Sequence, residues 1–71
     1  MEYLVVQFPE RRKVLVDGLY QGETGAILTM EAGTRKITLE PMDRCQPAQQ
    51  VVVLVATTPD SPYQVTFHLV A

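Results

Sequence analysis

Short runs of apolar residues, several of which alternate with polar ones, recur along the chain at intervals of roughly ten residues. They predict strands over residues 4–8, 14–16, 19–21, 26–30, 35–40, 51–55 and 63–69. Glycines and prolines separate the runs, and no segment is long enough for a helix that could connect parallel strands. The sequence therefore predicts an all-β fold: a small antiparallel β-sandwich of about six or seven short strands, in a single domain over residues 1–71.

The pattern of residues 26–30 is compatible with either a strand or a short helix. Residues 26–30 could form one or two helical turns, because Thr24 could cap a helix and Gly33 could end it. Short helices are marginal alone, however, and Ile27 and Thr29 are β-branched. A strand is therefore favoured over a helix.

Residues 32–34 are then expected to close a hairpin between residues 26–30 and 35–40. Alternation in the second run turns Ile37 and Leu39 toward a core. The residues expected to face water are Lys36, Thr38 and Glu40. Residues 41–50 have no periodicity and predict the longest loop.

The run VVVLV, residues 51–55, is apolar on both faces. This pattern suits either a central strand covered by a second layer or a subunit interface. The chain is too short to cover the run twice, so Val51, Val53 and Val55 are candidates for an interface with a protein partner, including a second copy of the chain.

Two glycine turns lie close together in VLVDGLYQGETGAI, residues 14–27. Asp-Gly between apolar runs indicates a two-residue type I′ hairpin, because these residue types tolerate positive φ. A loop-tip carboxylate such as Asp17 or Glu23 could also bind a metal or a sugar, but a turn role is favoured for Asp17. The residues assigned to structural turns are Asp17, Gly18, Gly22, Gly25 and Gly33.

The motif V-x-V-D-G at residues 14–18, with Gly22, Thr24 and the alternating strand after an Ala-Gly-Thr turn, resembles the PEGA domain. The similarity covers about residues 14–41, and Gly25 stands where that family usually has proline. The resemblance implies a small β-sandwich of bacterial and archaeal proteins with binding or scaffolding roles and no catalytic residues. The initial methionine and the short chain suggest a free-standing copy.

The charge balance argues against nucleic acid as the main partner. Six Lys/Arg residues against eight Asp/Glu give a net charge of −2, whereas phosphate-backbone binding depends on excess positive charge. One basic stretch keeps an alternative open, a nucleic-acid or carbohydrate-binding face of basic and aromatic residues. Its members would be the cations Arg11, Arg12 and Lys13 with the aromatic residues Tyr3, Phe8 and Tyr20. The more ordinary interpretation of these basic residues is a solvated strand edge.

Catalytic side chains are scarce. Cys45 and His68 are the only residues of their types, so no intrachain disulfide and no ordinary cysteine-histidine metal site can form. Cys45 beside Arg44 is a candidate reactive thiol, although an unreactive thiol is favoured. The sequence predicts no catalytic residue, cofactor or metal site, and no enzyme.

No secretory signal and no apolar run of about 20 residues is apparent, and a lone thiol suits a reducing compartment. We therefore expect a cytoplasmic, noncatalytic protein-interaction or scaffolding module that self-associates as a homodimer or larger oligomer, away from membranes.

Overall fold

Nine strands joined by turns make up residues 1–70, the part of the chain that the computed structural model describes. Seven of them are β1 (Glu2–Gln7), β2 (Lys13–Val16), β3 (Leu19–Glu23), β4 (Ile27–Met30), β5 (Gly33–Glu40), β7 (Gln50–Leu54) and β8 (Tyr63–Thr66). Two short ones are β6 (Cys45–Gln46) and β9 (His68–Leu69). The predicted all-β fold is confirmed. None of the described residues belongs to a helix that could cross a membrane.

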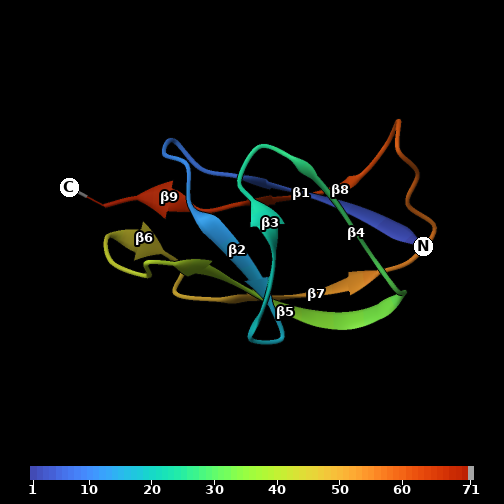
Figure 1. The fold of residues 1–71 in the computed structure, drawn as a ribbon, viewed down its shortest axis with the longest axis horizontal. Helices are drawn as coiled ribbons and strands as arrows, with labels where there is room; N and C mark the ends of the chain where they lie inside the picture. Colours follow the sequence, from blue (N-terminus) through green and yellow to red (C-terminus); the bar gives the residue numbers. More distant parts are fainter. Residues whose placement is uncertain (71) are drawn as a thin grey trace.

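The strands form two main sheets, which lie one above the other in Figure 1. One has the order β4-β1-β8 and the other the order β3-β2-β5-β7, while β6 and β9 pair separately. Every pair is antiparallel except β1 with β8, which is parallel. The parallel pair arises because β8 reaches β1 through a connection from the other sheet instead of through a hairpin.

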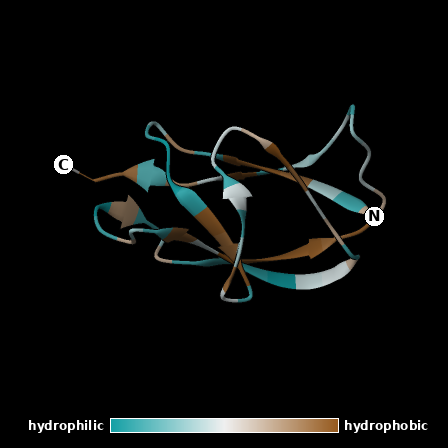
Figure 2. Cartoon of the chain, viewed as in Figure 1, coloured by the Kyte–Doolittle hydropathy of each residue, from teal (hydrophilic) through white to brown (hydrophobic). Residues whose placement is uncertain are grey.

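The core lies between the two sheets, because successive residues of a strand point to opposite faces and each sheet turns its apolar set inward. Figure 2 shows the apolar stretches, with β7 hydrophobic along most of its length. The largest fully buried side chains are Phe67, Leu4, Ile37, Leu39, Leu54, Val6 and Val14. Strands from both sheets therefore contribute to one hydrophobic core.

Residues 27–30 form the strand β4, so the preference for a strand over a helix is confirmed. The expected hairpin with β5 is wrong. β4 pairs with β1, whereas β5 pairs with β2 and β7, so the turn between them carries the chain from one sheet to the other. This crossing lets Leu28 of β4 and Ile37 of β5 both be buried, each from its own sheet.

Two smaller expectations also need correction. Thr38 does not face water but is 9% exposed, and it lies on β5, which has β2 on one side and β7 on the other. Residues 41–50 are not wholly a loop, since Cys45 and Gln46 form β6 and pair with β9.

The start of β1 is tied to the segment that follows β7. The Glu2 carboxylate accepts hydrogen bonds from the Thr57 hydroxyl (2.6 Å) and backbone N–H (2.8 Å), and the Tyr3 N–H donates to the Thr57 Oγ1 (2.7 Å). The bonds from Thr57, the hydroxyl first, hold the pKa of Glu2 below its ordinary value. These hydrogen bonds therefore stabilise the fold at pH values above the ordinary glutamate pKa. Their contribution is lost as the pH falls through the lowered pKa of Glu2.

Candidate functional site

The strand β7 lies at the edge of its sheet, because it pairs with β5 and with no other strand among residues 1–70. Of the two possibilities for residues 51–55, the covered central strand is therefore excluded: the sheet ends here, since β8 pairs with β1 in the other sheet. Val52 and Leu54 face the core. The alternate residues Val51, Val53 and Val55 expose 62%, 60% and 67% of their surface.

The backbone groups of Val51 and Val53 point toward the open edge. Lys36 uses its backbone on the β2 side, since its carbonyl accepts from the Asp17 N–H (2.8 Å) and its N–H donates to the Asp17 Oδ1 (3.0 Å). Lys36 lies directly opposite Val51 in the register. Residues opposite each other in an antiparallel pair alternate between bonding each other and pointing away. The N–H and C=O of Val51 and Val53 therefore point away from β5.

The other three edges of the two main sheets are each obstructed. The Gln21 side-chain amide donates to the Thr29 carbonyl of β4 (2.8 Å), and the Gln50 amide donates to the Thr66 carbonyl of β8 (2.7 Å). The edge strand β3 carries the charged Glu23 and pairs with β2 through an irregular register between Val14 and Leu15. Bulges, charges and covered backbone groups are the usual protection of strand edges.

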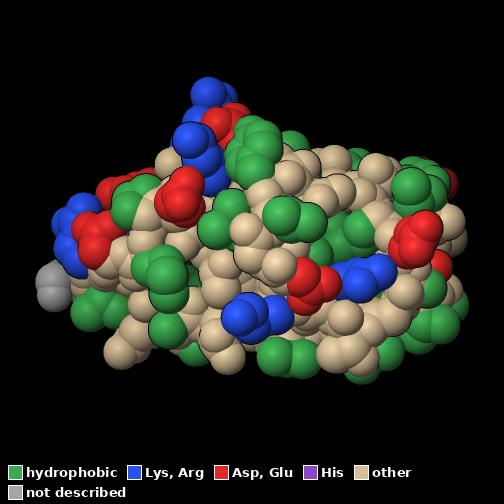
Figure 3. Space-filling view, turned by 60° about the horizontal axis from the view of Figure 1, so that its bottom comes forward, with side chains coloured by type: hydrophobic (Ala, Val, Ile, Leu, Met, Phe, Trp, Pro, Cys, Tyr) green, Lys and Arg blue, Asp and Glu red, His purple; other side chains and the backbone are tan. Residues whose placement is uncertain are grey.

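The edge of β7 has none of these devices. Its sequence, QVVVL, contains no charge, glycine or proline. Among residues 1–70, no side chain makes a hydrogen bond to the β7 backbone, since the Gln50 amide donates to β8. Figure 3 brings the lower side of Figure 1 forward and shows hydrophobic side chains in separate groups among charged ones. The notable property of β7 is therefore the combination of apolar side chains with an unobstructed backbone.

No family model, curated protein or solved structure matches this chain. The resemblance of residues 14–41 to the PEGA domain stays a prediction. The geometry of the residues themselves therefore carries the functional argument.

The Asp17–Gly18 turn has the predicted form. The φ angles are 52° at Asp17 and 85° at Gly18, as a type I′ turn between β2 and β3 requires. The Asp17 carboxylate also accepts from the Lys36 N–H and lies 3.4 Å from Arg35 Nη1. Asp17 thus fastens the hairpin to β5.

Gly25 lies in the turn between β3 and β4, and Gly33 begins β5, both with positive φ. The prediction of a turn at Gly22 is wrong: Gly22 also has positive φ, but it lies within β3, because the pairing with β2 continues through Gly22 to Glu23. Glu23 forms an ion pair with Arg11. Among residues 1–70, no group of three or more His, Cys, Asp or Glu side chains could hold a metal ion.

The residues proposed for a basic and aromatic face are not brought together. Arg12 is 5% exposed, so it does not belong to a surface. Arg11 is exposed and pairs with Glu23 (3.7 Å). Lys13 lies between two acids, opposite Glu23 on β3 and Glu40 on β5. Exposed Tyr20 lies opposite Leu15. Acidic neighbours thus offset the positive charges of Arg11 and Lys13.

Arg12 is a structural centre that the sequence did not reveal. Its Nη1 donates to the carbonyls of Pro41 (2.7 Å) and Asp43 (2.9 Å), and its Nη2 donates to the Glu10 carboxylate (2.9 Å). The guanidinium also lies 4.8 Å from the centre of the Phe8 ring, within cation–π range. Arg12 therefore joins the segment after β1 to the segment after β5.

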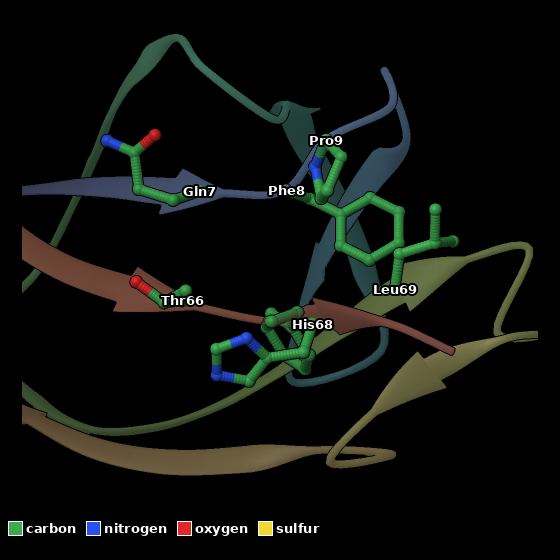
Figure 4. A pocket seen from close by; sticks show the side chains of 7 residues that line it. Gln7, Phe8, Pro9, Thr66, His68 and Leu69 are labelled. Carbon is green, nitrogen blue, oxygen red and sulfur yellow. The ribbon is translucent and has the colours of Figure 1, made fainter. Parts of the chain in front are cut away.

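Cys45 and His68 lie in different environments. Cys45 is buried in the core cluster, and its thiol donates to the Met42 carbonyl (3.1 Å). His68 is exposed and lines a hollow of about 430 Å³ beside Phe8, Thr66 and Leu69. Figure 4 shows the side chains of His68 and Leu69 pointing in opposite directions. The hollow is open to solvent, and its polar lining residues Gln7, Thr66 and His68 are all exposed, which is not the geometry of an enclosed ligand site.

Proposed function

We propose that the chain is a noncatalytic protein-interaction module that associates with copies of itself through β7. One observation carries the proposal: Val51, Val53 and Val55 have exposed apolar side chains, and the backbone groups of Val51 and Val53 point to an open sheet edge. Soluble proteins usually protect such an edge, because it is a template for pairing with another strand. An unprotected edge is therefore best explained as a binding surface.

Size also favours association. A chain of 71 residues builds only a small core, and self-association is one of the usual ways in which such domains gain stability. Cys45 is a free thiol, which agrees with a reducing compartment such as the cytoplasm. A scaffolding role would also fit the resemblance to the PEGA domain.

The alternative, a nucleic-acid or carbohydrate-binding face, has less support. Arg12 is occupied by internal carbonyls and a carboxylate, and Arg11 and Lys13 have acidic neighbours. The chain also carries a net charge of −2. Electrostatic attraction for phosphate is therefore small.

Multi-angle light scattering at micromolar to millimolar concentration tests the proposal. The native chain should have a mass of at least twice 8.0 kDa at the upper concentrations. Val53→Lys should weaken association about a hundredfold, because both copies lose apolar burial and gain a charge at the contact, about 2–4 kcal/mol in total. A native chain that stays at 8.0 kDa throughout would overturn the proposal.

Ile27→Lys is the matched control. Ile27 is 54% exposed and also lies on an edge strand, β4, in the other sheet. The same charge at that position should leave the mass unchanged. Equal effects of Ile27→Lys and Val53→Lys would show that general solubility, and not β7, governs association.

A further inference from the structure

We infer that the partner of β7 is β7 of a second copy, paired antiparallel about a two-fold axis through Val53, so that two four-stranded sheets become one continuous sheet of eight strands. The inference rests on the proposed function and specifies the geometry of the contact. It follows from the register of β7 and from the spacing of its exposed valines.

The spacing of the valines is self-complementary. Val51 and Val53 share the exposed face of β7, and Val55, which is also exposed, directly follows the end of the strand at Leu54. A two-fold axis at Val53 places Val53 beside its own copy and Val51 beside Val55 of the second copy. All three valines then find a valine across the axis. Moving the register by two residues would place one of them beside Gln49 or Thr57.

The backbone has the same symmetry. The N–H and C=O of Val51 and Val53 point toward the open edge, as deduced from the hydrogen bonds of Lys36. The antiparallel register about Val53 makes Val53 a hydrogen-bonded pair with its copy and Val51 a hydrogen-bonded pair with Val55 of the second copy. The free donors and acceptors of one edge thus meet those of the other.

Charges do not oppose this contact. β7 has no charged residue, and the nearest charge opposite an exposed valine is Lys36, which faces Val51. In the paired arrangement, Lys36 and its copy lie three strand spacings and four residues apart, about 20 Å. This separation exceeds the screening length of about 8 Å at physiological salt.

The area available indicates a modest affinity. One side of a standard interface covers about 800 Å². That is a little under a fifth of the 4323 Å² that the chain exposes. A five-residue edge covers less than this, so the dimer belongs with the small and weak interfaces. Concentrations in the upper micromolar range are therefore the right ones for the experiment.

Disulfide trapping tests the register. The variants Val51→Cys, Val53→Cys and Val55→Cys are oxidised separately, and Val51→Cys is also oxidised as an equal mixture with Val55→Cys. Hydrogen-bonded residues across an antiparallel pair have their Cα atoms about 5.5 Å apart, within disulfide range. Val53→Cys alone and the mixture should form covalent dimers about tenfold faster than Val51→Cys or Val55→Cys alone.

Two controls make the outcomes distinct. The native chain, whose Cys45 is buried, should not cross-link, and Ile27→Cys reports the background rate of an exposed thiol on another edge. Equal rates at all positions, in a chain that light scattering finds dimeric, would overturn this geometry and leave the proposed self-association standing. A chain that is monomeric by light scattering at the trapping concentration would overturn both.

Discussion

Replacing Arg12 with alanine is expected to lower the free energy of unfolding by about 3 kcal/mol, the largest effect of any single truncation of a charged residue in this chain. The substitution leaves the carbonyls of Pro41 and Asp43 without their charged donor and removes the contact with the Phe8 ring. A domain of this length is expected to have only about 4–10 kcal/mol of stability in total. Urea denaturation followed by circular dichroism measures the loss.

Arg11→Ala is the control for that experiment. Its side chain is 80% exposed and makes one long ion pair with Glu23, so its removal should cost less than about 0.5 kcal/mol. Arg12→Lys should lie between the two variants, because an ammonium group keeps the charge but not the planar arrangement of donors. Equal midpoints for Arg11→Ala and Arg12→Ala would contradict the structural role of Arg12.

Gly22→Ala should also be strongly destabilising, by about 2–4 kcal/mol. A Cβ at residue 22 would overlap the Cδ2 of Leu28, which is buried in the opposite sheet at 4% exposure. Overpacking of this kind typically costs about 1–3 kcal/mol. The φ of +157° at Gly22 adds backbone strain for any L residue. Thermal unfolding should show a midpoint lowered by roughly 8–32 °C, at about 4–8 °C per kcal/mol.

Gly25→Ala separates the two causes. Gly25 also has positive φ, +86°, but a Cβ there would meet no atom within 4 Å. Only the cost of the left-handed backbone, about 1 kcal/mol, should remain. A Gly25→Ala variant as unstable as Gly22→Ala would mean that contact with Leu28 is not what requires glycine at residue 22.

The strands and the tight turn could be predicted from the sequence because their causes are local. The alternation of apolar and polar residues indicates which residues of a strand face the core, and an Asp-Gly pair indicates the positive φ angles of a type I′ turn. The strand over residues 27–30 was likewise indicated by its own β-branched residues. The strand with which it pairs could not be predicted in this way, because the pairing of β4 with β1 depends on which sheet buries Leu28.

The candidate site was predictable only in part. The sequence identified Val51, Val53 and Val55 as surplus apolar residues, but not that β7 lies at an edge, because strand order follows from contacts distant in the sequence. The prediction that Arg12 belongs to a basic surface is wrong for the same reason, since the contacts of Arg12 are also distant in the sequence. The carbonyls that surround its guanidinium come from Pro41 and Asp43, 29 and 31 residues farther along the chain.

Amide hydrogen exchange at individual residues, measured by NMR over a range of protein concentrations, tests most directly whether β7 is an open edge that a second copy closes. The amides of Val52 and Leu54 should be protected at every concentration, since they face β5. Those of Val51 and Val53 should exchange rapidly in dilute solution and become protected as the concentration rises. Rapid exchange of Val51 and Val53 in a sample that is fully dimeric would contradict the account, as would protection of both amides in the monomer.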